Sequence, residues 1–144
     1  MCTSNDSLPQ NVRVRIEVTK GSHIKRGSHG EVDFVSPIPC PWNYGSAIAT
    51  VGPDGDPIDV VVLGAPIARD EVVKVELQGR IPFLDGGVID DKWIAAAGPL
   101  DADQIRTIER FFTRYAKAKR IHGRIRFRSG ETRADRYQVW KDER

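Results

Sequence analysis

Asp54-Gly55-Asp56-Pro57-Ile58-Asp59 runs directly into the apolar segment Val60-Val61-Val62-Leu63. Gly55 permits a positive φ and Pro57 stiffens the backbone, so the three carboxylates can converge on one point where a strand begins. Neighbouring carboxylates repel one another unless a cation lies between them, and oxygen ligands favour hard cations such as Mg²⁺, Mn²⁺ or Ca²⁺. The stretch therefore predicts a cation site at the mouth of a strand. The alternative interpretation is a solvated turn, because Asp and Gly are common in turns.

Two other stretches favour the cation site over the turn. A second acidic group, Asp85 with Asp90 and Asp91, again lies beside apolar, strand-like residues, and Lys92 follows it directly. Upstream of the first group the chain reads Pro39-Cys40-Pro41-Trp42-Asn43-Tyr44-Gly45. Three separated stretches therefore carry the residues of chemical interest.

The composition is that of an ordinary globular protein, but its charge is unevenly distributed. The 144 residues fit one domain, long enough to bury about two-thirds of the surface of the unfolded chain. The net charge is +2, yet residues 54–103 hold 11 acidic and 4 basic side chains, while residues 106–144 hold 13 basic and 5 acidic ones. An acidic centre and a basic end suit a site for a metal ion with a phosphorylated ligand, although a basic end is equally common as a solvated face.

The cysteines and the hydropathy bear on location and domain organisation. Cys2 and Cys40 form no disulfide framework and no zinc motif. No apolar run approaches the length of a membrane span or of the core of a signal peptide. We therefore expect a cytoplasmic protein with a flexible N-terminal segment at residues 1–11 and a single domain at residues 12–144.

Short strands separated by turn residues dominate the first hundred residues. Residues 12–18 alternate strictly between apolar and charged side chains, which predicts a half-buried strand with Glu17 near its end. Residues 20–30 predict an exposed turn or hairpin, residues 31–35 a weaker strand, and the proline-rich residues 36–42 no central strand. Further strands are predicted at residues 58–63, 72–78, 80–84 and 92–97. This pattern indicates a barrel or a sandwich.

One helix is predicted after residue 100. Asp101 is a candidate N-cap with Gln104 three residues on, as in a capping box. Apolar side chains then recur at helical spacing: Ile105, Ile108, Phe111, Phe112 and Tyr115. The helix is predicted to end towards Gly123, and residues 124–128 to form a final strand with Ile125 and Phe127 facing inward. Residues 137–140 fit either a strand or a tail.

The three stretches together resemble the soluble inorganic pyrophosphatases of the Mg²⁺-dependent barrel-fold family, family I. The resemblance spans residues 14–128, and its most specific part is the signature at residues 54–59. It implies an α+β, mainly β fold: a five-stranded, closed β-barrel of the oligonucleotide-binding type with one long C-terminal helix. It also implies hydrolysis of inorganic pyrophosphate to two phosphates by a Mg²⁺-activated water.

The resemblance implies roles for individual residues. Five acidic side chains would hold the metal: Glu17, Asp54, Asp59, Asp85 and Asp90. Four residues would bind the substrate: Lys25, Tyr44, Lys92 and Tyr115. Asp56 lies between two metal-directed carboxylates, so we expect it to act as the general base that accepts a proton from water. The expected partners are inorganic pyrophosphate or a related small phosphorylated substrate, and other copies of the chain in a hexamer or dimer, with no nucleic acid and no membrane.

Five positions depart from the family pattern: Gly27, Val32, Cys40, Gly86 and Ala116. Cys40 replaces an aromatic residue, and the other four replace charged ones. Each lost charged contact costs about 1.5–3 kcal/mol, or ten- to hundredfold in rate when it acts in the transition state. The sequence leaves open whether these departures allow full activity or cause a reduced rate or an altered substrate preference. The arginine that is missing at position 32 could be replaced by an arginine at position 26, 126 or 128.

Two other functions compete with hydrolysis. One is a catalytically degenerate protein of the same fold that binds a metal–phosphate ligand or a protein partner. The other is a nucleic-acid-binding barrel that stacks bases on Phe127, Tyr137 and Trp140. The acidic centre argues against nucleic acid, because its carboxylates would repel a phosphate backbone.

Overall fold

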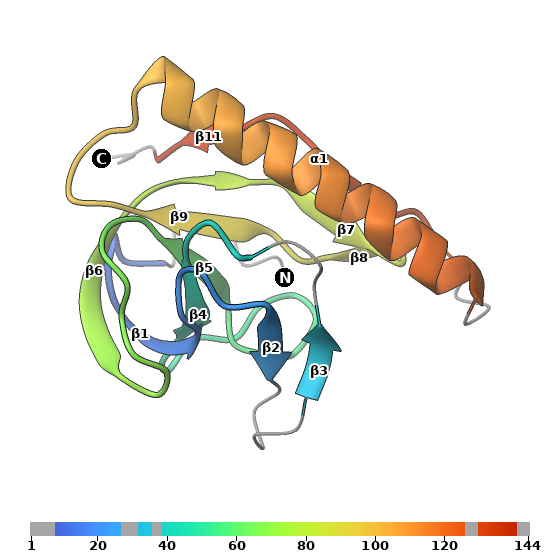
Figure 1. The fold of residues 1–144 in the computed structure, drawn as a ribbon. Coiled ribbons are helices and arrows are strands. Elements are labelled where there is room, and N and C mark those ends of the chain that lie inside the picture. Colours follow the sequence, from blue (N-terminus) through green and yellow to red (C-terminus); the bar gives the residue numbers. More distant parts are fainter. Residues whose placement is uncertain (1–7, 27–31, 36–38, 126–129, 141–144) are drawn as a thin grey trace.

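The architecture is a closed, mixed five-stranded β-barrel flanked by one long helix (Figure 1). The computed structural model describes residues 8–26, 32–35, 39–125 and 130–140. The barrel strands are β1 (Asn11–Val18), β4 (Asn43–Ala47), β5 (Asp59–Val62), β9 (Lys92–Ala95) and β6 (Val72–Ile81), in that order, and β6 pairs with β1 to close the barrel. The helix is α1 (Ala102–Ile125). The predicted fold class is confirmed.

Short strands decorate the barrel. A hairpin is formed by β2 (Ile24–Arg26) and β3 (Val32–Val35), in the region where the sequence predicts an exposed hairpin. A three-stranded sheet has the order β10 (Arg133–Ala134), β7 (Phe83–Asp85) and β8 (Val88–Ile89). At the C-terminal end, β11 (Gln138–Val139) extends the barrel sheet beside β6.

The alternation of residues 12–18 produces the strand it predicts. Along β1 the even-numbered residues are buried, and Val14 and Ile16 are fully inaccessible, while Arg13 and Arg15 are exposed. Because successive side chains of a strand point to opposite faces, the even positions fill the barrel and the odd positions, Glu17 included, lie on its outer face.

Two apolar cores hold the molecule together. The barrel interior is filled by Val12, Val14, Ile16, Ala47, Val60, Val62, Leu77, Trp93 and Ala95. The second core lies between the outer face of the barrel and α1, and consists of Val61, Ile81, Phe83, Ile94, Ile108, Phe112 and Ala116. Successive residues of β5 and β9 therefore serve different cores, which explains why these two strands are apolar without alternation.

The predicted start of the helix is confirmed in detail. The backbone N–H of Gln104 donates to Asp101 Oδ1 at 2.8 Å, and the N–H of Asp101 donates to Gln104 Oε1 at 2.9 Å. This reciprocal pair is a capping box, which satisfies donors that the first turn of a helix leaves open. Of the apolar stripe, Ile108 and Phe112 are buried, and Ala116, four residues after Phe112, is buried as well.

Several predicted boundaries are wrong. The helix continues through Ile125, so the predicted strand at residues 124–128 is wrong at its first two residues, and residues 126–129 lie outside the described part. The predicted strands 72–78 and 80–84 are instead a continuous β6 followed by β7, with an irregularity between Leu77 and Gly79. Residues 1–7 of the expected flexible segment are also outside the described part, and β1 begins at Asn11.

Strand β4 lies within a motif that carries no strand pattern. Gly45 packs so closely on the backbone of Arg15 in β1 that any side chain would collide with it. Asn43 is fully buried: its Oδ1 accepts from the N–H groups of Lys20 and Ile67, at 3.0 and 2.8 Å. Its Nδ2 donates to two carbonyls at the end of β5 and beyond it. Asn43 therefore anchors the strand rather than the ligand site.

Candidate active site

The topology of β5 and β9 brings the two acidic stretches together. These two strands are parallel, the only parallel pairing among the described residues, and their first residues, Asp59 and Lys92, are register partners. The first acidic stretch leads into β5 and the second leads into β9. Because parallel strands start at the same edge of a sheet, both stretches arrive at one edge of the barrel.

Lys92 is the centre of the cluster at this edge. Its ammonium lies 2.8 Å from Asp59 Oδ2 and 2.9 Å from Asp90 Oδ2, and it donates to the Tyr44 hydroxyl at 3.3 Å. Its side chain is only 2% exposed, whereas those of the two carboxylates are 21% and 19% exposed. A charge that is buried this deeply is costly unless it is paired, and here two carboxylates share it.

The protonation of the cluster follows from burial and from these contacts. Burial raises the pKa of Asp90; Lys92 lowers it and Asp59 raises it, and the net pKa is above the ordinary value. Burial alone would lower the pKa of Lys92, but Tyr44 and the two carboxylates hold it well above the ordinary value. Burial also raises the pKa of the Tyr44 hydroxyl, despite the nearby ammonium. At neutral pH the cluster therefore presents a charged ammonium and an un-ionised phenol.

Glu17 joins the same row of side chains from β1. Ser46 of β4 is the register partner of Asp59, and its hydroxyl donates to Glu17. The row thus runs across four barrel strands, from Glu17 through Ser46 and Asp59 to Lys92. The predicted strand-end glutamate lies in the line of carboxylates, on the outer face of the barrel.

The loop before β5 presents two more carboxylates to solvent. Asp54 and Asp56 are both exposed, and the N–H of Asp56 donates to Asp54 Oδ1 at 3.0 Å. Gly55 between them has φ 86°, which confirms the expected left-handed conformation. The stretch is therefore a turn that leads its last carboxylate, Asp59, into the cluster.

Asp85 lies at the end of β7 and pairs with a residue that the sequence analysis did not single out. Lys119 of α1 has its ammonium 2.7 Å from Asp85 Oδ2. The sequence feature that could have identified Lys119 is its spacing: it lies one helical turn after Tyr115, so the two side chains share one face of the helix. The next positions, Gly86 and Gly87, both have positive φ, 60° and 85°, in the two-residue turn between β7 and β8. A two-residue turn with positive φ at both positions accepts Asp-Gly as well as Gly-Gly, so the turn does not explain the glycine at position 86.

Tyr115 faces the site from the helix, within a group of aromatic rings. Its ring centroid lies 5.8 Å from that of Phe83 and 6.1 Å from that of Phe112, and the Lys119 ammonium lies 5.4 Å from its own. The Tyr115 ring therefore packs in the aromatic group, and it also borders the ion pair of Asp85 and Lys119.

The remaining predicted residues are only partly placed. Lys25 is in β2 as the register partner of Phe34, but its side chain is outside the described part. Gly27 and the candidate arginines at positions 126 and 128 also lie outside it. Asp91, next to Asp90, has a separate structural partner, because Arg80 lies 2.7 Å from its Oδ2. Sequence alone does not distinguish these two adjacent acids.

The donor chemistry fits a hard divalent cation, although the described residues form no complete ligand group. Asp59 and Asp90 already converge on one cation, the Lys92 ammonium. Carboxylate oxygens are also the ligands that Mg²⁺ prefers. Among the described residues, however, no three His, Cys, Asp or Glu side chains lie close enough together to hold a metal ion. The site thus supplies a pair of converging carboxylates, with the others arranged around it.

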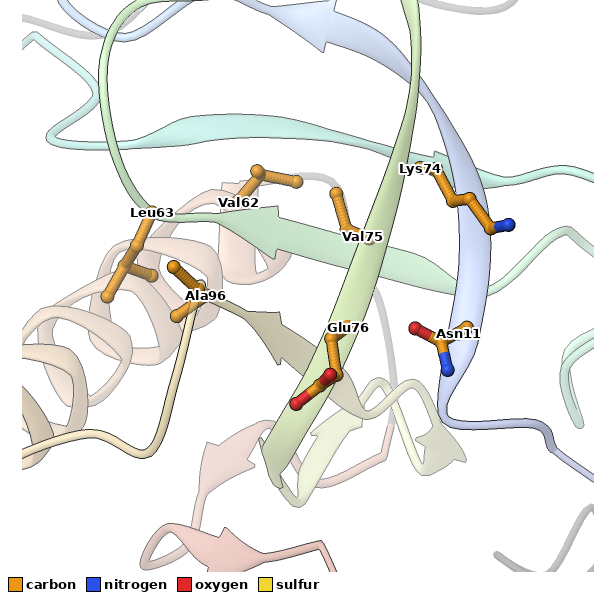
Figure 2. Close-up of a pocket in the computed structure, with 8 residues that line it drawn as sticks. Asn11, Val62, Leu63, Lys74, Val75, Glu76 and Ala96 are labelled. Atoms are coloured by element: carbon orange, nitrogen blue, oxygen red, sulfur yellow. The ribbon is translucent and has the colours of Figure 1, made fainter.

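A separate hollow lies at the other end of the same strands. Figure 2 shows this pocket, of about 380 Å³, beside Val62 and Leu63 at the end of β5 and Ala96 after β9, with Lys74 and Glu76 of β6. Asp59 and Lys92 are at the opposite ends of β5 and β9. The pocket is therefore distinct from the carboxylate cluster.

The aromatic residues considered for nucleic-acid stacking have packing partners. Trp140 lies edge-to-face on Trp93, with ring centroids 5.7 Å apart. Tyr137 is half-buried against the core under α1. Position 127 lies outside the described part. The two described rings therefore contribute to the fold.

The comparisons with known proteins agree along almost the whole chain. The family model "Inorganic pyrophosphatase" matches residues 7–139. The soluble inorganic pyrophosphatase of Zea mays is 32% identical in an alignment of 129 residues, gaps included, that covers 76% of this chain and 60% of the maize protein. The inorganic pyrophosphatase of Xanthomonas axonopodis pv. citri (strain 306) is 31% identical in an alignment of 134 residues, gaps included, that covers 85% of this chain and 68% of that protein.

Solved structures extend the likeness to three dimensions. The crystal structure of an inorganic phosphatase from Anaplasma phagocytophilum matches with a TM-score of 0.73 and 26% identity, over 92% of this chain and 86% of that one.

The chain spans about three-fifths of the length of the plant relatives that it matches. In the part of the chain that the structure describes, no helix has the length and apolar character needed to cross a membrane.

Proposed function

The chain belongs to the inorganic pyrophosphatase family, and we propose that it hydrolyses inorganic pyrophosphate to two phosphates. The observation that carries this proposal is the cluster at the start of β5 and β9, where Asp59, Asp90 and Tyr44 converge on the buried Lys92 ammonium. It combines paired carboxylates with cationic and hydroxyl donors, as a metal–polyphosphate complex requires.

The metal proposed is Mg²⁺, held by Asp54, Asp59, Asp85, Asp90 and Glu17. When bound, Mg²⁺ would supply charge neutralisation on the phosphate oxygens and would lower the pKa of a water molecule. The support for it is the donor set, which consists of carboxylates, and the convergence of Asp59 and Asp90 on a cation.

The protein's own groups would bind the substrate and move the proton. Asp56 accepts the proton as the water oxygen bonds to one phosphorus and the bond from that phosphorus to the bridging oxygen breaks. The departing phosphate takes the electron pair. Lys25, Lys92, Tyr44 and Tyr115 would hold the phosphate oxygens, and the exposure of Asp56 suits contact with a water molecule.

We also propose that the protein acts in the cytoplasm as a homo-oligomer, a hexamer or a dimer, and binds neither nucleic acid nor membrane. The oligomer is proposed on the resemblance to the family I inorganic pyrophosphatases. The molar mass in solution, measured by light scattering, tests the oligomer.

The first test is phosphate release from pyrophosphate in millimolar Mg²⁺. We expect the wild type to release phosphate, and Asp56→Asn and Asp59→Asn to abolish the release because they remove the proton acceptor and a member of the cluster. Asp103→Asn is the matched control: Asp103 is an exposed acid in the first turn of α1, and this variant should match the wild type.

The same measurement separates hydrolysis from the degenerate alternative. A wild type that binds Mg²⁺ and diphosphate but releases no phosphate would refute the hydrolase and favour a protein that binds a metal–phosphate ligand or a partner. A wild type with slow release that both substitutions abolish would leave the chemistry as proposed and assign the departures a role in rate or substrate preference.

A further inference from the structure

Two ammonium groups border the cluster, and their surroundings differ. Lys92 is 2% exposed and is shared by two carboxylates and a hydroxyl. Lys119 is 29% exposed, and its ammonium is paired with Asp85. A buried ammonium held by two carboxylates is fixed in place, whereas a partly exposed lysine can exchange its partner by rotating its long side chain. Lys119 is therefore the more accessible cation of the two.

The position of Lys119 on α1 aims it at the site. It lies four residues after Tyr115, so the two share one face of the helix, and its ammonium lies 5.4 Å from the centroid of the Tyr115 ring. Its pKa is raised: burial acts to lower it, while Tyr115 and Asp85 raise it more, and Lys92 also lowers it. Phe83 lies between the two lysines, since its ring centroid is 5.2 Å from the Lys92 ammonium and 5.8 Å from the centroid of the Tyr115 ring.

The intervening helix positions offer no alternative cation. Ala116 directly follows Tyr115, carries no charge and is 1% exposed in the core between α1 and the barrel. Lys117 is exposed. Position 119 is thus the first place after Tyr115 from which α1 presents a cation at the end of β7.

We propose that Lys119 is a substrate-binding residue, which exchanges Asp85 for a phosphate oxygen of the diphosphate and so provides the cation that position 116 lacks. This proposal rests on the proposed function, because the ligand is the same diphosphate. An ammonium is suited to phosphate as a compact charge with three donors. The bond to Asp85 holds it ready at the end of β7.

The test is the affinity for methylenediphosphonate, a diphosphate with a carbon bridge that is not hydrolysed, measured by calorimetry in Mg²⁺. We expect Lys119→Met to weaken binding roughly ten- to hundredfold, as for a lost charged hydrogen bond, and to raise KM for pyrophosphate more than it lowers kcat. Lys119→Arg should keep most of the affinity. Lys117→Met, an exposed lysine two positions away, is the matched control and should bind as the wild type does.

The outcomes separate this proposal from the proposed function. A Lys119→Met variant that melts at a lower temperature but binds the analogue as the wild type does would show a structural ion pair only and would overturn the proposal. Lys119→Gln keeps a polar head on a shorter stem and serves if the methionine variant does not fold; unchanged affinity there would overturn it as well. A wild type that neither binds the analogue nor hydrolyses pyrophosphate would instead refute the proposed function.

Discussion

At the scale of single residues, Lys92 is a buried cation that is paired with two carboxylates. Its ammonium holds Asp59 and Asp90 together, and both carboxylates are about four-fifths buried. Removing one member of a buried pair leaves charge without compensation, which costs far more than the intact pair contributes. The stability of this edge of the barrel therefore depends on a cation being present.

We expect Lys92→Met to lower the free energy of unfolding by about 3–5 kcal/mol in metal-free buffer. Added Mg²⁺ should recover part of that loss, because a second cation can replace the ammonium between the carboxylates. Urea denaturation with and without Mg²⁺ measures both effects. Lys117→Met is the control for loss of a lysine, and a loss of under about 1 kcal/mol in the Lys92 variant would contradict this account.

Some residues of the site could be identified from the sequence, and others could not. The acids of residues 54–59 stand out because three carboxylates so close together are unusual, and the structure brings Asp59 into the cluster with Asp90. The pairing of Lys119 with Asp85 is different, since it joins positions 34 residues apart in the chain. No local pattern encodes such a contact; it becomes visible only once the helix is docked on the barrel.

At the scale of elements, the start of α1 was predictable because its signals are local. The capping box joins residues three positions apart, and the apolar stripe follows helical spacing. The end was mispredicted because Arg-Ile-Arg-Phe-Arg alternates as a strand does, over only five residues. Helical hydrogen bonding extends instead through Ile125, and a single Gly123 costs a helix only about 1 kcal/mol.

We expect Asp101→Ala to cost about 0.5–2 kcal/mol of stability, because it removes the acceptor for the N–H of Gln104. Asp103→Ala is the matched control, since Asp103 is 86% exposed and its pair with Arg106 is at the surface. Thermal unfolding of both variants provides the measurement. Equal melting temperatures for the two would mean that the capping box contributes nothing beyond its charge.

At the scale of the whole molecule, the fold class could be predicted from the sequence, but the strand order and pairing could not. Short strands with frequent turns indicate a barrel or sandwich, and the family resemblance selects the barrel. The sequence does not show β4 as a strand because two of its residues are not strand formers. Gly45 lies where the backbone of Arg15 comes too close for a side chain, and Ser46 donates a hydrogen bond to Glu17. The parallel pairing of β5 with β9 arises from closure of the whole barrel, which no single segment specifies.

The whole fold should also lose stability in alkaline solution. Burial raises the pKa of Tyr137 to about 12, from 10.0 for an ordinary tyrosine, and those of Tyr44 and Lys92 are raised as well. Since the folded state binds these protons more tightly, their stabilisation is complete below pH 10.0, and the part due to Tyr137 is lost as the pH rises through about 12.

We therefore expect the free energy of unfolding, followed by far-UV circular dichroism in urea, to fall between these two pH values. Tyr137→Phe should make the fall shallower, because phenylalanine has no proton to lose. Near neutral pH this tyrosine keeps its proton in both states, so it should not make the free energy of unfolding depend on pH there. A fall of the same steepness in both proteins would assign the effect to other groups.

The strand order also bears on when a newly made chain acquires its binding groups. In space β9 lies between β5 and β6, although it follows both in the chain. The barrel can therefore be completed on that side only after β9 has been synthesised, and such non-local pairing is slow compared with the formation of a helix. Only that pairing sets Lys92 beside Asp59. A nascent or half-folded chain thus carries all the acids of the proposed site in its sequence, but the site itself is assembled only when β9 pairs with β5.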